Sequence, residues 1–224
     1  QRILLFDVHG KPVSGWEYKK ANSNLVGQAQ LIQLGRKDYL AFFTADGGVT
    51  LRNRRGQERV KMSGAVNLKD PELFVIKGAT LADSRLVGLS ATGQLTSIFL
   101  NGTVDVTDIG ITSSNARLYH FKGHQIVLEG NEVRVSGPDV NYSFSASDPL
   151  DRVVYTFDMG PHFAIGLQSS ETKNIWLLDA AGQPQSGFPV PGDAGMTIRD
   201  LDLDGKLELI TLDSDGYVYN YSLD

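Results

Sequence analysis

The sequence contains no cysteine among its 224 residues. Disulfide bridges, thiolate catalysis and cysteine-ligated zinc sites are therefore excluded. The absence of cysteine does not fix a compartment, but it is compatible with the bacterial cell envelope. We accordingly favour a periplasmic or extracellular location in the envelope.

Long apolar runs and a surplus of basic charge are also missing. The longest uncharged apolar runs are only a few residues, such as 74–76, whereas a membrane span needs about 20. No signal-like apolar stretch follows Gln1, and we expect the chain to belong to a longer or processed protein. With 21 basic and 26 acidic residues, the net charge of −5 argues against nucleic-acid binding, which needs a basic field. The basic cluster of the chain is interpreted as a solvated turn; it comprises Arg52, Arg54, Arg55 and Arg59.

Helical periodicity is lacking too. No stretch of twelve or more residues places apolar side chains at i, i+3, i+4 and i+7. The chain instead consists of short β-rich runs divided by Gly, Asp and Asn turns, and its 41% hydrophobic and 21% charged residues are typical of globular proteins. This pattern predicts an all-β fold, and internal repeats decide between a sandwich, a barrel and a propeller.

The clearest repeat joins the two ends of the chain. Residues 4–16 match residues 176–188, since both read as an apolar strand, Asp, two residues, Gly, a polar residue, Pro, two residues, Gly and an aromatic residue. The same turn glycine recurs at Gly10, Gly56, Gly102, Gly137 and Gly182. Successive differences are 46, 46, 35 and 45 residues, and periods of this size are typical of propeller blades. We expect Trp16 and Phe188, which the alignment makes equivalent, to pack between blades.

A second series of glycines lies one strand earlier in each repeat. It comprises Gly47, Gly93, Gly130 and Gly216, each after an apolar run, and such residues suit tight hairpins. The member expected near residues 171–172 lacks its glycine. One blade then contains strands near 31–34, 39–43, 49–53 and 58–62. Comparable units begin near residues 31, 73, 118, 153 and 197.

We therefore predict a single β-propeller domain over residues 1–224, with about five to six four-stranded blades. The strand predicted at residues 3–8 has no inner pair before it. Two interpretations stay open. Residues 3–18 complete the last blade and remove its open edge, or the chain is the C-terminal part of a larger propeller.

These units resemble the degenerate propeller repeats of bacterial proteins that are grouped as pyrroloquinoline-quinone-like or WD-like. The resemblance implies the fold and not the quinone cofactor, and the chain has no Trp-Asp dipeptide. Residues 200–209 also resemble the calcium loop of integrin-type FG-GAP repeats, whose pattern is Asp-x-Asp-x-Asp-Gly-x-x-Asp.

The acidic loop is the strongest chemical feature of the sequence. Calcium needs several oxygen ligands on a sharply turning loop. Here Asp200, Asp202 and Asp204 stand at alternate positions, Gly205 permits the turn, and Glu208 adds a carboxylate at the ninth position. An EF-hand is rejected because its twelfth position is a threonine here and strands flank the loop. The loop predicts a calcium site with Asp200, Asp202, Asp204 and Glu208 as ligands, and a solvated acidic turn is the alternative.

No catalytic arrangement is visible in the sequence. His120 and His124 flank a predicted hairpin, but zinc needs three or four ligands and no third is identified. A Gly-x-Ser-x-Gly elbow and a Walker loop are both missing. We therefore expect no enzyme activity and no cofactor other than calcium.

The leading hypothesis is a non-catalytic propeller that offers a rigid face to a protein partner, as an interaction or scaffolding module. The alternative is a carbohydrate-binding or carbohydrate-active propeller, which an exposed aromatic platform beside two carboxylates would favour. A purely structural C-terminal domain of a larger protein is a third hypothesis.

Overall fold

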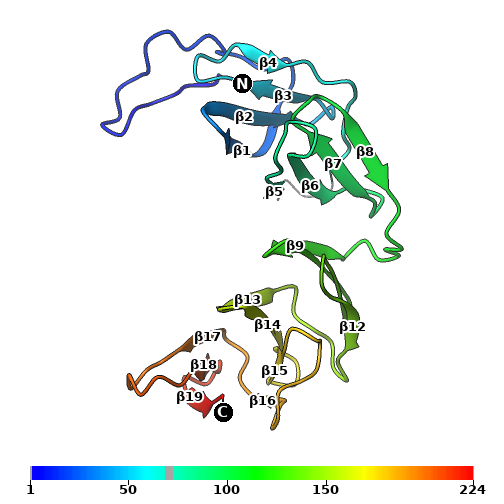
Figure 1. Cartoon of the computed structure of the whole chain (residues 1–224), viewed down its shortest axis with the longest axis vertical. Helices are drawn as coiled ribbons and strands as arrows, with labels where there is room; N and C mark the ends of the chain where they lie inside the picture. The colour runs from blue at the N-terminus through cyan, green and yellow to red at the C-terminus, as the bar shows by residue number, and fades with distance from the viewer. Residues whose placement is uncertain (1, 69–72, 224) are drawn as a thin grey trace. The chain divides into compact units, whose positions relative to one another are not determined.

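The computed structural model describes residues 2–68 and 73–223, and the strands in these ranges form five antiparallel sheets (Figure 1). The chain divides into two compact units, residues 1–114 and 115–224. No helix occurs within the described ranges, so no helical segment there has the length and hydropathy to cross a membrane. The predicted all-β class is confirmed.

The unit of residues 1–114 holds two four-stranded sheets in which the spatial order equals the sequence order. The first consists of β1 (Leu25–Leu34), β2 (Lys37–Thr44), β3 (Val49–Arg52) and β4 (Glu58–Val60). The second consists of β5 (Phe74–Ile76), β6 (Arg85–Leu89), β7 (Leu95–Phe99) and β8 (Val104–Thr107). Ahead of β1, residues 2–20 form an extended arm with two isolated bridges, Arg2 to Lys20 and Phe6 to Pro12.

The unit of residues 115–224 holds three sheets with the same meander. The first consists of β9 (Arg117–Phe121), β10 (His124–Glu129), β11 (Glu132–Ser136) and β12 (Asn141–Ser145). The second consists of β13 (Val154–Met159), β14 (His162–Ser169), β15 (Asn174–Leu178) and β16 (Val190–Pro191). The last has three strands in the described residues, β17 (Met196–Arg199), β18 (Glu208–Leu212) and β19 (Val218–Ser222). Four-stranded meanders of this kind are the blades of a β-propeller.

The repeated hairpins share one turn geometry. In the complete form of this turn, the carbonyl of its first residue accepts the backbone N–H of the glycine three positions later, and the side-chain oxygen of the same residue accepts the N–H groups two and four positions later. Five turns show the complete pattern and begin at Asp7, Asn53, Ser90, Asp179 and Asp213. Their glycines all have φ between 75° and 91°, a region that favours glycine. Local side-chain chemistry thus explains the repeat glycines that lie in these five turns, whereas Gly137 has no left-handed φ.

Close packing against a neighbouring segment is a second reason for some of the repeat glycines, namely Gly56, Gly102 and Gly182. A Cβ at Gly182 would lie 2.3 Å from the ring of Tyr142 on β12, the outer strand of the preceding blade. A Cβ at Gly102 would meet Lys61 just after β4 in the same way, and one at Gly56 would meet Tyr18 of the N-terminal arm. The arm therefore takes, against the first sheet, the place that an outer strand takes elsewhere.

Apolar clusters fill the spaces between neighbouring sheets of each unit. On β14 and β15, one set of alternate residues, Phe163, Ile165, Leu167, Trp176 and Leu178, packs toward β10 and β11. The other set, Ala164, Ile175 and Leu177, packs toward β17 and β18. Successive side chains of a strand point to opposite faces. Strands that are buried on both faces therefore read as the continuous apolar runs seen in the sequence.

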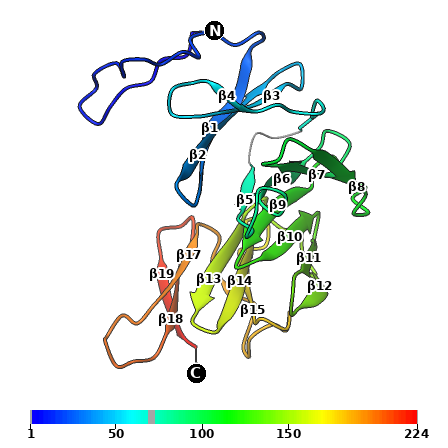
Figure 2. The ribbon, with the colours of Figure 1, turned by 45° about the horizontal axis from the view of Figure 1, so that its top comes forward.

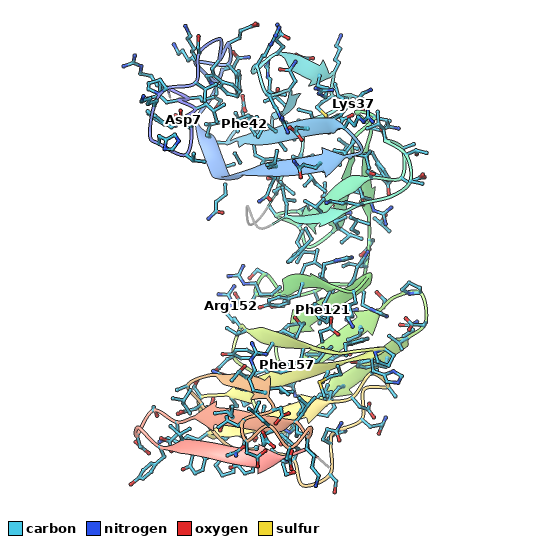
Figure 3. All side chains as sticks on the ribbon, turned by 60° about the vertical axis from the view of Figure 1, so that its left-hand side comes forward. Asp7, Lys37, Phe42, Phe121, Arg152 and Phe157 are labelled. Carbon is cyan, nitrogen blue, oxygen red and sulfur yellow. The ribbon has the colours of Figure 1, made fainter. Side chains whose placement is uncertain are left out.

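The predicted equivalence of Trp16 and Phe188 agrees with this packing. Trp16 is buried and lies 6.4 Å from Phe42 of β2, between centroids, so it joins the arm to the first sheet (Phe42 is labelled in Figure 3). Phe188 is half-buried and packs on the cluster that joins β14 and β15 to β17 and β18. Phe188 thus lies between two neighbouring blades, and Trp16 lies between the N-terminal arm and the first sheet.

The first strands of the five sheets begin at residues 25, 74, 117, 154 and 196. The last four are within one residue of the predicted 73, 118, 153 and 197, whereas the first begins six residues before the predicted 31. Residues 3–8 differ from the prediction, because the arm has isolated bridges instead of a strand ladder. The single domain and the two interpretations of residues 3–18 stay predictions.

Candidate functional site

The acidic loop joins β17 to β18, and it brings three of its four predicted ligands together. One carboxylate oxygen from each of Asp200, Asp202 and Glu208 lies within 4.8 Å of the other two. Asp204 is not in this group, and its Oδ1 accepts a hydrogen bond from the backbone N–H of Lys206 at 2.8 Å. Within the described residues, no other group of three His, Asp or Glu side chains brings its potential ligand atoms this close together.

The loop wraps around its own carboxylates because two residues take left-handed backbone conformations. Leu203 has φ 64° and Gly205 has φ 88°. Asp200 Oδ2 accepts the N–H of Gly205 at 3.0 Å, and Glu208 Oε2 accepts the N–H of Leu201 at 2.8 Å. The other oxygen of Asp200, Oδ1, is buried and has no hydrogen-bond partner. A hard cation is the kind of partner that such an oxygen lacks.

A cavity of about 400 Å³ borders the loop. Its lining comes from β13, β17 and the loop between β17 and β18, namely Thr156, Phe157, Asp158, Thr197, Ile198, Arg199, Asp200 and Leu207 (Phe157 is labelled in Figure 3). The inner strands of two neighbouring sheets thus form a hollow that is lined by both polar and apolar side chains and carries charges of both signs. The cavity has space for a small polar ligand or for the side chain of a partner.

A second polar arrangement repeats in successive blades, and the sequence did not reveal it. Asp193 precedes β17 and accepts hydrogen bonds from Ser214 N at 2.5 Å and Ser214 Oγ at 2.7 Å. Asp151 precedes β13 and accepts the same two hydrogen bonds from Ser170, with Gln168 Nε2 at 2.7 Å as a third donor. Each aspartate therefore fixes the hairpin turn that connects the second and third strands of its own blade.

Burial raises the pKa of the Asp151 carboxyl, but the hydrogen bonds from Ser170 and Gln168 outweigh it and hold this pKa below its usual value. The carboxylate form is therefore the form that the fold stabilises. A regular spacing of Asp and Ser by about 20 residues is the signal in the sequence that could have found these pairs.

Two lysines connect the turns of neighbouring blades. Lys122 Nζ, between β9 and β10, lies 2.5 Å from Asp158 Oδ1 and 2.7 Å from Gly160 O at the end of β13. Lys173 Nζ, between β14 and β15, lies 2.5 Å from Asp215 Oδ2 in the turn between β18 and β19. Both lysines have positive φ, 47° and 56°. Lys173 occupies the turn where the glycine series has its gap, and its hydrogen bond to Asp215 raises the pKa of its ammonium group.

The last strand presents a row of tyrosines. Tyr217, Tyr219 and Tyr221 follow one another along one face, with ring centroids 6.4 Å and 6.2 Å apart. Tyr219 donates its hydroxyl hydrogen to Asp213 Oδ2 at 3.0 Å, and this hydrogen bond raises the pKa of the phenol. Tyr217 is 64% exposed. An aromatic row beside carboxylates is suited to cationic or amphipathic groups.

The histidines do not converge. His124 is buried against the ring of Phe163, at 4.7 Å between centroids, and its Nε2 lies 2.6 Å from Asp139 Oδ1. His120 is paired with Gln125 in the β9–β10 ladder. Neither histidine belongs to a group of three potential metal ligands in the described part of the chain. This geometry favours the structural interpretation of both.

The basic cluster lies on β3, on β4 and in the turn between them, and three of its arginines contact residues of their own unit. Arg52 stacks over Tyr18 at 4.1 Å, Arg59 lies over Tyr39 at 5.2 Å, and Arg54 pairs with Asp38.

The net charges of the two units differ strongly. Residues 1–114 contain 14 basic and 10 acidic residues, a net charge of +4, and residues 115–224 contain 7 and 16, a net charge of −9.

No protein-family model matches the chain, and no curated protein matches it. Solved structures do resemble it. The crystal structure of BBS1N in complex with ARL6DN aligns with 100% of this chain and 72% of its own, with a TM-score of 0.62 and 16% identity. Kluyveromyces lactis Hsv2 aligns with 89% of this chain and 63% of its own, with a TM-score of 0.53 and 12% identity. A eukaryotic initiation factor aligns with 94% of this chain and 54% of its own, with a TM-score of 0.53 and 14% identity.

Identities this low establish the fold alone. The matched structures are β-propellers, and the sheets of this chain are meanders of the same kind. The chain therefore has a β-propeller fold, as its glycine repeat predicts.

Proposed function

We propose that the chain is a non-catalytic β-propeller module that binds a protein partner through its hairpin turns. One observation carries the proposal: hydrogen bonds to aspartate side chains fix the turns of successive blades, as in the pairs Asp151 with Ser170 and Asp193 with Ser214. Turns that are ordered before binding lose little conformational entropy when a partner docks on them. A rigid array of polar turns is therefore suited to recognition.

The structural comparison supports the same function. BBS1N, which aligns with the whole of this chain, was crystallised in a complex with ARL6DN. Propellers use one scaffold for many unrelated functions, so the identity of the partner is specific to this chain. We further propose a location in the bacterial envelope, with which the absence of cysteine is compatible and to which the resemblance of the repeats to bacterial pyrroloquinoline-quinone-like and WD-like units adds only the bacterial origin.

The experiment is affinity capture followed by a binding measurement with purified components. The full chain is immobilised, captured proteins are identified by mass spectrometry, and the best candidate is titrated calorimetrically against the chain. The heat-unfolded chain is the control, and the proposal expects saturable binding by the folded chain alone. Turnover of a glycoside, ester or phosphate substrate that disappears when one carboxylate is mutated would overturn the non-catalytic assignment.

We further propose that the acidic loop is an FG-GAP-like calcium site held by Asp200, Asp202 and Glu208. Calcium takes six to eight oxygen ligands, so water and backbone carbonyls would complete the shell. The buried Oδ1 of Asp200, which has no hydrogen-bond partner, supports the assignment. A bound ion would hold β17 to β18 and stabilise the last hairpin. Asp204 would not bind the ion directly but would support the conformation of the loop, through its hydrogen bond with the N–H of Lys206.

Carbohydrate binding is the second candidate function. The exposed Tyr217 and the neighbouring Asp213 and Asp215 are the aromatic and carboxylate groups that such a site needs. Soluble cello- and chito-oligosaccharides that quench tyrosine fluorescence in wild type and not in Tyr217→Ala would favour this candidate over the first.

A further inference from the structure

The first sheet carries four exposed cations at one of its ends, in the two turns that join its strands there. Arg36 and Lys37 lie at the β1–β2 turn, and Arg54 and Arg55 lie in the β3–β4 turn (the strands are labelled in Figure 2 and Lys37 in Figure 3). The ladder registers from β1 to β4 place both turns at the same end of the sheet. These four residues are called the basic patch.

Three cations of the patch have no anionic partner in the described part of the chain. Arg36, Lys37 and Arg55 are exposed, and their side chains form no ion pair or hydrogen bond with the described residues. Glu58, which follows the second turn, is exposed too and pairs with none of them. These cations can therefore pair with an incoming anion without breaking a contact of the fold.

Arg54 differs from the other three because a buried carboxylate anchors it. Asp38 is 7% exposed and forms an ion pair with Arg54, whose side chain is 77% exposed. A guanidinium group has five N–H donors in a planar fork, so the contact with Asp38 leaves donors that face the solvent. Arg54 is held in place and can still bind a second carboxylate.

The turn that presents Arg54 and Arg55 does not need either side chain for its own conformation. Asn53 Oδ1 fixes this turn by accepting the N–H groups of Arg55 at 2.8 Å and Gln57 at 3.1 Å. The equivalent turn that begins at Asp179 has the same two hydrogen bonds with alanine at both positions. The fold of the turn thus does not explain the arginine pair, which points to a role in binding.

Charge complementarity identifies the partner as a short acidic segment. Outside the basic patch, 17 of the 21 basic residues remain against 26 acidic residues, a net charge of −9. A nucleic acid or an anionic membrane extends beyond the patch and would be repelled by this charge. Neither turn contains a large apolar side chain that could enter a bilayer. An acidic peptide segment, in contrast, can contact the patch alone.

We propose that the basic patch binds an acidic segment of a protein partner, in which Asp or Glu recurs. The carboxylates of this segment form ion pairs with the three unpaired cations of the patch. Arg54 adds the donors that Asp38 leaves free, in the paired geometry that arginine offers to carboxylates. This inference rests on the proposed protein-binding function and specifies the surface and the partner.

The probe is a fluorescein-labelled seven-residue peptide in which Glu alternates with Ser, titrated into the full chain by fluorescence anisotropy. The control peptide carries Gln in place of Glu. Because the chain has a net charge of −5, its overall field repels the Glu peptide. The proposal expects saturable binding of the Glu peptide alone, with an affinity that falls as the salt concentration rises. Equal binding of the Gln peptide, or no binding of the Glu peptide at low salt, would overturn it.

Charge reversals locate the site. Lys37→Glu changes the charge within the patch, and Lys61→Glu makes the same change at an exposed lysine just after β4, toward the opposite end of the sheet. We expect Lys37→Glu to weaken binding of the Glu peptide about fivefold, which corresponds to the roughly 1 kcal/mol of an exposed ion pair. Arg55→Glu should cause a similar loss, and Lys61→Glu should leave the affinity nearly unchanged. Equal losses for the two lysine variants would show that the overall charge governs binding, and would refute the site.

Failure of this inference is distinguishable from failure of the proposed function. A protein partner that binds Lys37→Glu and Arg55→Glu with wild-type affinity refutes the patch and leaves the protein-binding function standing. Absence of saturable binding by any protein refutes the proposed function, and with it this inference. Tighter binding of phosphatidylserine vesicles or of a DNA duplex than of the Glu peptide would assign the patch to another class of partner, and would also refute the inference.

Discussion

Asp193 and Asp151 occupy the same place in two successive blades, each bonded to the backbone and hydroxyl of a serine in the turn that follows the second strand of its blade. The two differ in burial. Asp193 is 9% exposed, whereas Asp151 is half-buried and has an additional donor, Gln168. The hydrogen bond from the serine hydroxyl is therefore expected to contribute a different free energy of stabilisation in the two blades.

The first prediction follows from this difference. Ser214→Ala removes the hydroxyl donor from a buried carboxylate, and we expect it to lower the free energy of unfolding by about 1.5–3 kcal/mol, the range for hydrogen bonds to charged groups. Ser170→Ala is the matched variant and should cost less, because Asp151 keeps Gln168 and more water. Urea denaturation followed by tryptophan fluorescence measures both, and an equal or larger loss for Ser170→Ala would contradict the argument.

Stability should also depend on pH through Asp151. Hydrogen bonds hold its pKa in the folded state below the ordinary value of 3.8, so its contribution is fully present above about pH 4 and is lost as the pH falls through the folded-state pKa. We expect the stability difference between wild type and Asp151→Asn to shrink as the pH is lowered from 7 through this window. A difference that stays constant down to the lowest pH would show that Asp151 titrates equally in both states.

The turn glycines allow a third test, with a control in the same unit. Gly182 and Gly216 occupy the same turn position with φ 81° and 91°. A Cβ at Gly182 would collide with the Tyr142 ring, whereas one at Gly216 would meet nothing within 4 Å. We expect Gly216→Ala to cost about 1–2 kcal/mol from backbone strain, and Gly182→Ala to cost about 1–3 kcal/mol more from overpacking. Thermal melting followed by circular dichroism gives the comparison, and equal losses would show that the contact with Tyr142 adds nothing.

The glycine repeat predicted the blades because each turn depends on a few adjacent residues. The turn that begins at Asp179 and contains Gly182 depends on neighbouring residues alone. Such a turn can therefore be predicted from the sequence wherever an aspartate or asparagine precedes a glycine by three positions. The gap near residues 171–172 shows the limit of this reasoning, because Lys173 takes the left-handed position without being glycine. Residues 3–8 show another limit, since their apolar pattern predicted a strand where the arm has only bridges.

Contacts between blades could not be predicted from the sequence. Lys122 meets Asp158 across 36 residues, and Lys173 meets Asp215 across 42. Which turns face each other depends on how the sheets pack, and no local pattern encodes it. In the acidic loop, the alternation of aspartates indicated a cluster, but the turn at Leu203 directs Asp204 to the backbone of Lys206 instead.

The last prediction concerns calcium and uses this placement of Asp204. An ion that binds the folded state alone raises stability by RT ln(1 + [Ca²⁺]/Kd), about 2.7 kcal/mol at 100 times Kd. We expect calcium to raise the melting temperature of wild type relative to chelator, and Asp202→Ala to abolish this rise because it removes a carboxylate of the converging group. Asp204→Ala should keep most of it, since Asp204 lies outside the group. Identical melting of wild type with calcium and with chelator would show that the loop is a solvated acidic turn, and equal effects of the two alanine variants would contradict the three-carboxylate site.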